Sequence, residues 1–268
     1  MEERNHTYYS QPNSLQASGL AIGYREKVLA ENLNIAVGPG EVAALLGRNG
    51  IGKSTLLKTL TGELPPIRGT VEVCGRPLAS LSRKEMAKMM AVVSTERVDA
   101  GALTVQELVS LGRHPYTGFF GGLGDTDRKA VVEAMESTGI AYKRDAFVAT
   151  LSDGERQKAM IARALAQQTP VLALDEPFSF LDVASRVGIL AMLKRVAAAR
   201  GLTVLFTSHD VAQALRMADR VWVFSHDRHL SGGTPREMID SGAIETLFAD
   251  SEVRFNPSQF DFVETDGQ

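Results

Sequence analysis

The sequence from residue 47 to residue 55 reads G-R-N-G-I-G-K-S-T and contains the phosphate-loop pattern G-x-x-x-x-G-K-[ST]. Residues 41–46 precede it as a short apolar run, which is typical of a buried parallel strand. Leu56, Leu57 and Leu60 follow it at helical spacing. We therefore predict a strand, a loop and a helix in this order, which is the context that the motif requires, and a chance match becomes the less favoured alternative.

The chemistry of this loop follows from its residue types. Glycines allow the backbone to curl, so that consecutive N–H groups point at phosphate oxygens, and the following helix adds the positive end of its dipole. We expect the Lys53 ammonium to reach the β- and γ-phosphates and the Ser54 hydroxyl to ligate Mg²⁺. The candidate phosphate-binding residues are Gly47, Arg48, Asn49, Gly50, Ile51, Gly52, Lys53, Ser54 and Thr55.

The composition favours a globular α/β protein. The 268 residues suffice for one large domain or two small ones, and 44% of them are hydrophobic. The 29 basic and 32 acidic residues give a net charge of −3, so no basic excess indicates a nucleic-acid partner. The single cysteine, Cys74, excludes an internal disulfide, and we interpret it as a packing residue. No apolar run reaches the ~18 residues of a membrane span, which predicts a protein that is soluble or held at a membrane by a partner.

A second group of candidate residues follows the apolar run 171–174, where Asp175 and Glu176 stand together. A buried strand that ends in two carboxylates is the expected second element of a phosphate-loop nucleotidase. Asp175 would hold Mg²⁺, usually through water, and Glu176 would orient or deprotonate the attacking water. A pair of loop carboxylates without catalytic function is the alternative.

His209 follows another apolar run, at residues 203–207. Because the carboxyl ends of parallel strands meet at one edge of a sheet, we expect His209, Glu176 and the phosphate loop to lie close together. There His209 could donate a hydrogen bond to the γ-phosphate and sense its presence. A structural histidine at a strand end is the alternative.

The hydrophobic pattern divides the chain into three parts. We expect a flexible leader at 1–17, a single domain at 18–250 and a polar tail at 251–268. Within the domain, Ser82 and Thr104 can begin helices with capping boxes, and Gly139 can end a third helix. The predicted helices dominate residues 83–163, which we interpret as a helical insertion on the α/β core.

The ordered set 47–55, 151–155, 172–177, 179–182 and His209 resembles an ATP-binding-cassette (ABC) ATPase over residues 20–234. The signature stretch L-S-D-G-E at 151–155 makes the resemblance specific, because other phosphate-loop families lack it. The resemblance implies an α/β phosphate-loop core with an antiparallel β subdomain and a helical insertion. It also implies ATP and Mg²⁺ as cofactors, and ATP hydrolysis in a head-to-tail dimer.

The same resemblance implies roles for further residues. Tyr24 resembles the aromatic residue that stacks on adenine, with packing as the alternative. Ser152 and Gly154 resemble signature residues that contact the γ-phosphate from the opposite subunit, and His209 resembles the switch histidine. The loop that couples the two sites corresponds to Ser179, Phe180, Leu181 and Asp182.

Three departures from the family pattern stand out. Asp153 replaces the first glycine of the signature and Glu155 replaces its glutamine; both acids suit a helix N-terminus but would lie near a bound triphosphate. After residues 91–93 the family has Pro-Gln, whereas this chain has Ser94, Thr95 and Glu96. Either the Thr95 hydroxyl or the Glu96 carboxylate could replace the glutamine that touches Mg²⁺.

The stretch L-G-R-H-P-Y at 111–116 resembles the ABC importers of iron chelates, haem and cobalamin. Membership of this group would imply a transport ATPase bound to an integral membrane permease at the cytoplasmic face of the inner or plasma membrane. A periplasmic or surface substrate-binding protein would act with it indirectly. Residues 119–122 are candidates for contact with the permease. The alternative is a soluble ABC ATPase with another function, such as iron–sulfur cluster assembly.

Overall fold

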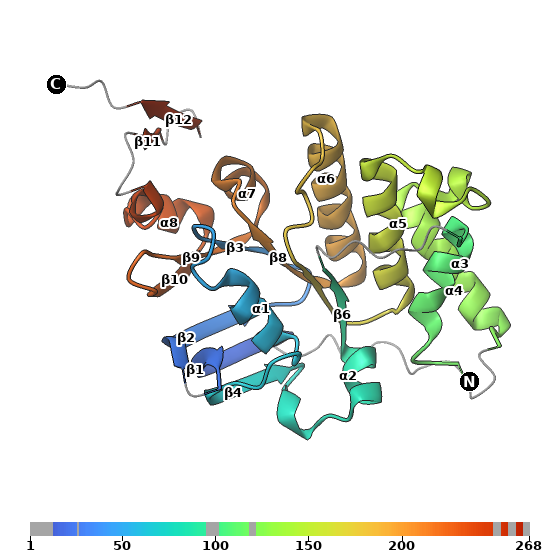
Figure 1. Cartoon of the computed structure of the whole chain (residues 1–268), viewed down its shortest axis with the longest axis horizontal. Helices are drawn as coiled ribbons and strands as arrows, with labels where there is room; N and C mark the ends of the chain where they lie inside the picture. Colours follow the sequence, from blue (N-terminus) through green and yellow to red (C-terminus); the bar gives the residue numbers. More distant parts are fainter. Residues whose placement is uncertain are drawn as a thin grey trace.

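The computed structural model describes residues 13–25, 27–94, 102–117, 122–248, 253–256 and 261–264. Within them lie a six-stranded central sheet in the order β10-β9-β3-β8-β7-β6, a four-stranded antiparallel sheet in the order β2-β1-β4-β5, and a separate pair, β11 and β12 (Figure 1). The strands are β1 Leu15–Tyr24, β2 Lys27–Val37, β3 Val42–Leu46, β4 Arg68–Val73, β5 Arg76–Pro77, β6 Met90–Val93, β7 Val171–Leu174, β8 Thr203–Ser208, β9 Arg220–Phe224, β10 Leu230–Gly233, β11 Val253–Asn256 and β12 Asp261–Glu264. The helices are α1 Lys53–Leu60, α2 Arg83–Met89, α3 Val105–Ser110, α4 Asp125–Thr138, α5 Asp153–Ala166, α6 Val183–Arg200, α7 Val211–Met217 and α8 Pro235–Asp240.

The central sheet is parallel from β6 through β7, β8 and β3 to β9, and β10 pairs antiparallel at its edge. All residues of β3, β7 and β8 are buried, which explains why β3 and β7 read as continuous apolar runs and why β8 has polar residues at its ends alone. In register, Leu46 of β3 lies beside Ser208 of β8, and Leu174 of β7 lies beside Phe206. The residues that follow β3, β7 and β8 therefore meet at one edge of the sheet, as predicted.

Helix α1 packs into a core that the two larger sheets share. Leu56, Leu57 and Leu60 are buried in one cluster with residues of β1, β2 and β4 and with residues of β3, β7 and β8. The antiparallel sheet begins earlier than the predicted domain boundary, since Leu15 is fully buried and pairs with Val37 and Val73. Residues 15–17 therefore belong to β1 and not to a flexible leader.

Helices α3, α4 and α5 pack together beside the central sheet (Figure 1). The predicted capping boxes at Ser82 and Thr104 are present, and Gly139 ends α4 with a left-handed φ of 67°. The strand β6 lies inside the expected insertion at 83–163, yet it pairs with β7 in the central sheet. The helical part of the described structure is therefore narrower than that expectation.

Helix α6 begins at Val183, because the Asp182 side chain accepts the backbone N–H of Ser185 and caps the helix. The C-terminal tail differs from the prediction. In the expected polar tail, β11 pairs with β12, and Phe255 is buried in the core. Among the helices in the described ranges, none is long and apolar enough to cross a bilayer.

Candidate nucleotide-binding site

The loop between β3 and α1 requires glycine at several positions. Gly50 and Gly52 have φ angles of 76° and 127°, which residues with side chains rarely adopt. A Cβ atom on Gly52 would lie 2.9 Å from Cδ2 of Leu29, and one on Gly47 would lie 3.1 Å from Cβ of Phe224. The loop is thus a backbone cradle at the N-terminus of α1, which suits an anion such as a phosphate. Arg48, Asn49 and Gly50 are exposed, and Ile51 packs against the core.

Lys53 is held inside this cradle. Its ammonium donates hydrogen bonds to the carbonyl oxygens of Gly47 at 2.7 Å and Arg48 at 3.2 Å, and only 5% of the residue is exposed. Burial lowers the pKa of Lys53, while the carboxylates of Glu176 and Asp175 oppose this shift. Oε1 of Glu176 lies 4.0 Å from Nζ. The loop therefore contains a poorly solvated cation that gains from the approach of an anion.

An oxygen-rich site lies beside the loop, where the ends of β7 and β8 meet α1. Oδ1 of Asp175 accepts hydrogen bonds from Ser54 Oγ at 3.3 Å and from Thr207 Oγ1 at 2.7 Å. Hydroxyl and carboxylate oxygens suit Mg²⁺, which usually keeps several waters and takes its remaining ligands from substrate phosphates. In the described part of the chain, no three His, Cys, Asp or Glu side chains cluster in a way that could hold a metal ion.

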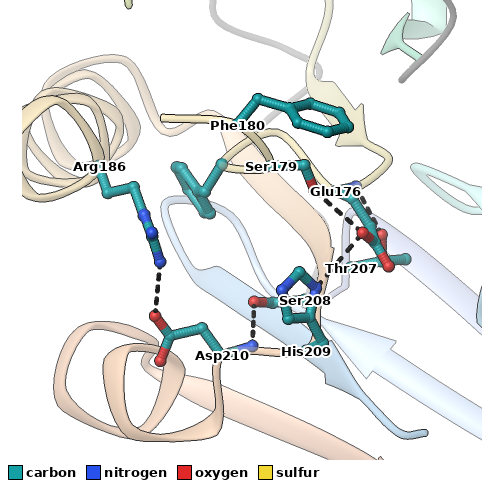
Figure 2. A pocket seen from close by; sticks show the side chains of 9 residues that line it. Glu176, Ser179, Phe180, Arg186, Thr207, Ser208, His209 and Asp210 are labelled. Atoms are coloured by element: carbon teal, nitrogen blue, oxygen red, sulfur yellow. Dashed lines mark hydrogen bonds and ion pairs between the residues drawn. The ribbon is translucent and has the colours of Figure 1, made fainter. Parts of the chain in front are cut away.

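Glu176 occupies an unusual backbone conformation, with a φ of 41°. Its N–H donates to Thr207 Oγ1 at 2.7 Å, and its Oε2 accepts the Ser179 hydroxyl at 3.0 Å. Nδ1 of His209 lies 3.4 Å from the same carboxylate oxygen (Figure 2). The carboxylate is thus fixed from two sides and stays partly exposed, as a group that receives a proton from water must be.

His209 lies between two pockets. The first, of about 280 Å³, extends from Glu176 and Ser179 past Phe180 to Asp210 (Figure 2). The second, of about 310 Å³, is bounded by the phosphate loop at 47–49 and by residues 211 and 247–248. The imidazole is 56% exposed, so it can interact with a ligand that extends from the loop. The structure therefore brings His209, Glu176 and the loop together, as the sequence predicts.

Thr207 is a residue of this site that the sequence-based prediction did not include. Its side chain is fully buried, and it connects the backbone of Glu176 with the carboxylate of Asp175. The signal is present in the sequence, because a hydroxyl stands at the end of an otherwise apolar strand, two residues before His209.

Tyr24 lies at the end of β1, near the start of α1. The Thr55 hydroxyl lies 3.5 Å from the Tyr24 hydroxyl, and 57% of the tyrosine is exposed. A ring that packed in the core would be covered, so this exposure favours the stacking role over the packing alternative.

The signature stretch forms the start of α5. Ser152 caps the helix, with its backbone N–H donating to Oε2 of Glu155 at 3.0 Å and its Oγ accepting the Glu155 N–H. Oε1 of Glu155 accepts the Tyr142 hydroxyl at 2.8 Å and lies 3.5 Å from Nζ of Lys143. These hydrogen bonds lower the pKa of Glu155 to about 2. Glu155, which replaces the glutamine of the family pattern, therefore binds groups of its own chain, and Lys143 balances its charge.

The other two departures contribute to a narrow pocket beside the carboxylates. Asp153 and Ser94 line it together with Asp175, Glu176 and Phe180. Thr95 and Glu96, the candidates to replace the glutamine, lie outside the described residues, and so do residues 118–121. A Cβ atom on Gly154 would lie 2.8 Å from Ser185 Oγ, which places this glycine against the start of α6.

A family model described as "ABC transporter" matches residues 30–179, which is more than half of the chain. The chain belongs to the ABC transporter family. The matched range contains the phosphate loop, the signature stretch, Asp175 and Glu176.

Relatives match this ABC protein over most of its length. It is 37% identical to the iron(3+)-hydroxamate import ATP-binding protein FhuC of Bacillus subtilis, with 91% of each chain covered. It is 36% identical to the ferric enterobactin transport ATP-binding protein FepC of Escherichia coli, covering 87% of this chain and 86% of FepC. Among solved structures, a chain of an inward-facing ABC transporter described as metal-chelate type superposes with a TM-score of 0.78 at 26% identity, covering 94% of this chain and 95% of that one.

The L-G-R-H-P-Y stretch of this ABC protein has a structural role. The Arg113 guanidinium is buried, donating to the carbonyl oxygen of Ala166 at 2.7 Å, to Gln168 Oε1 at 2.9 Å and to Asp127 Oδ1 at 2.9 Å. It also lies 4.0 Å from the centre of the Tyr116 ring. These contacts tie the C-terminal end of α5 to the start of α4, so this motif stabilises the helical part.

Proposed function

We propose that this chain is the ATP-hydrolysing subunit of a transporter that imports a metal chelate, such as an iron–siderophore complex, haem or cobalamin. The observation that carries the proposal is the convergence of Lys53, Asp175, Glu176 and His209 at one sheet edge, in a chain whose relatives include FhuC and FepC. Their printed names refer to import of iron(3+)-hydroxamate and transport of ferric enterobactin. None of them refers to cluster assembly, so the alternative function has no support among these relatives.

In the proposed reaction the loop N–H groups and Lys53 bind the phosphates of ATP. Ser54 and Asp175 would hold Mg²⁺, which neutralises phosphate charge when bound. Glu176 accepts a proton from the attacking water, and its hydrogen bond from Ser179 orients the carboxylate for this step. His209 donates a hydrogen bond to the γ-phosphate and stabilises the charge that develops on it. Tyr24 stacks on the adenine ring.

The active unit of this proposal is a head-to-tail dimer in which Ser152 and Gly154 of a second copy contact the γ-phosphate. Apolar surface next to the coupling loop supports a contact between copies. Phe180 is 82% exposed and Val183 is 73% exposed, which is unusual for side chains of this size. The loop 179–182 would then communicate between the two sites.

The proposed partner is an integral membrane permease, with an external substrate-binding protein acting through it. In this proposal the permease would hold the chain at the cytoplasmic face of the membrane. We propose no nucleic-acid partner, since the net charge is −3.

Hydrolysis and partner capture test this function separately. Glu176→Gln should bind ATP but reduce Mg-dependent hydrolysis by about 100-fold or more, because a general base contributes about 10²–10⁴-fold to the rate. The matched control is Glu63→Gln, which removes an exposed carboxylate outside the site. Tagged Glu176→Gln with ATP and Mg²⁺ should also co-purify with a multi-span membrane protein from native membranes. Full hydrolysis by Glu176→Gln would contradict its assigned role, and capture of soluble scaffold proteins alone would contradict transport.

A further inference from the structure

A closed ring of contacts joins the coupling loop to the loop that carries His209. At one end of the ring, the Glu176 carboxylate lies between the Ser179 hydroxyl and Nδ1 of His209 (Figure 2). At the other end stands Arg186, in the first turns of α6. Its Nε donates to the carbonyl oxygen of Leu181 at 2.9 Å, and its Nη1 lies 3.3 Å from Oδ2 of Asp210.

Both partners of Arg186 are part of the site's framework. Leu181 belongs to the coupling loop, and its carbonyl fixes the chain two residues after Ser179. Asp210 directly follows His209 and caps α7, since its Oδ1 accepts the backbone N–H of Gln213 at 3.0 Å. One guanidinium therefore spans the two loops, which Glu176 also joins through Ser179 and His209. A guanidinium suits this task because its planar fork can donate in two directions at once.

The ring surrounds the pocket of about 280 Å³ that Glu176, Phe180 and His209 line. Arg186 lines this pocket on the side opposite Glu176 (Figure 2). Its side chain is about one-third exposed, as is that of Asp210, so this pair contributes little to the free energy of unfolding. The contacts of Arg186 instead have a geometric effect, because they set the distance between the coupling loop and the backbone of His209.

We infer that Arg186 is a positioning residue that ties the coupling loop to the His209 loop and thereby holds Glu176 and His209 in register for hydrolysis. This inference rests on the proposed function only for its kinetic consequence. The tie itself is a property of the fold. Lys53 bonds to the phosphate loop, whereas Arg186 bonds to the coupling loop and to Asp210. Loss of Arg186 should therefore lower the rate of hydrolysis and leave ATP binding unchanged.

Arg186→Met keeps the apolar stem and removes both hydrogen bonds. We expect kcat to fall about tenfold while KM for ATP changes by less than twofold, because small misplacements of reacting groups are costly. Arg186→Lys should recover part of the loss, since one ammonium can serve only one partner well. Asp210→Asn keeps the helix cap but removes the negative charge. In the double variant with Arg186→Met, the fold-decrease in kcat should be smaller than the product of the fold-decreases in the two single variants.

The matched control is Lys194→Met, which breaks another ion pair of α6, with Asp219 at 3.0 Å. It should leave kcat unchanged. An NMR readout separates the inference from the proposed function: the His209 ring resonance, assigned with His209→Gln, should shift in Arg186→Met and not in Lys194→Met. If the wild type hydrolyses no ATP, the proposed function fails and the NMR result alone decides the tie. An unchanged His209 resonance, an unchanged kcat in active protein, or an equal loss in Lys194→Met would each overturn the inference.

Discussion

The Thr207 hydroxyl donates a 2.7 Å hydrogen bond to Oδ1 of Asp175 and accepts one of the same length from the N–H of Glu176. One buried hydroxyl thus sets the positions of both carboxylates, although it belongs to β8 and they follow β7. Glu176 has a left-handed φ of 41°, and in this conformation its peptide N–H has the Thr207 hydroxyl as its partner.

Thr207→Val tests this relationship with almost no change in side-chain volume. We expect the free energy of unfolding to fall by about 1–3 kcal/mol, because the Glu176 N–H loses its partner. We also expect kcat/KM for Mg-ATP to fall about tenfold, with a higher Mg²⁺ requirement. Urea denaturation and Mg²⁺ titration of the hydrolysis rate measure the two effects. Thr207→Ser keeps the hydroxyl and should stay near wild type on both; a Val variant as active as the Ser variant would contradict this role.

Glu155, the acidic residue of the signature stretch, should make a pH-dependent contribution to the free energy of unfolding. Its pKa of about 2 in the folded protein lies below its ordinary value of 4.5, mainly because the Ser152 N–H and the Tyr142 hydroxyl bind the ionised form. A depressed pKa stabilises the fold above the unfolded value and loses this effect as pH falls from about 5 to about 2. The ion pair with Lys143 of the same chain also stabilises the ionised form of Glu155.

Glu155→Gln should therefore flatten part of the decline in melting temperature between pH 5 and pH 3. Glutamine can still form the capping box, so the helix start survives. Tyr142→Phe removes one of the hydrogen bonds and should flatten the decline less. Melting curves recorded by circular dichroism at each pH give the answer. If the melting temperature of Glu155→Gln falls with pH as steeply as that of the wild type, the hydrogen-bonded carboxylate contributes no stability that is lost in acid.

Much of the site could be predicted because its elements are local. The phosphate loop, the strand that ends in Asp175 and Glu176, and the strand before His209 each show a buried run followed by polar residues. Parallel-sheet geometry then places their carboxyl ends together. The helix starts at Ser82 and Thr104 were predictable for the same reason, because a capping box spans only four residues.

The contacts that could not be predicted join residues distant in the sequence. Thr207 reaches Asp175 and Arg186 reaches Asp210 only through the order in which the strands pair and the rotation of α6. The start of β1 at Leu15 was missed because its pairing with Val37 and Val73 outweighs the weak local pattern around it. Tertiary contacts decided each of these cases.

Arg113 offers a test of the motif that resembles the importer group. Its buried guanidinium has hydrogen-bond partners at the start of α4 and at the end of α5, so Arg113→Met removes the donor of the Ala166 carbonyl and of Oδ1 of Asp127. We expect the free energy of unfolding to fall by about 3–5 kcal/mol, the range for breaking a buried ion pair. Arg144→Met is the control, since Arg144 is paired with Asp145 at the surface and should change stability by less than about 0.5 kcal/mol. Equal stability of the two variants in urea would show that Arg113 is dispensable.

Tyr24 separates recognition of the base from recognition of the phosphates. The residue is more than half exposed, and within the described residues its hydroxyl has a long contact with Thr55. Stacking of a base on an aromatic ring contributes about 1–3 kcal/mol, so Tyr24→Ala should weaken ATP binding about tenfold or more. Tyr24→Phe keeps the ring and should bind ATP as the wild type does. Titration calorimetry in the Glu176→Gln background measures binding without hydrolysis. The melting temperatures should stay close in all three proteins, since more than half of the tyrosine is exposed. A lower melting temperature with unchanged affinity in Tyr24→Ala would instead assign the ring to packing.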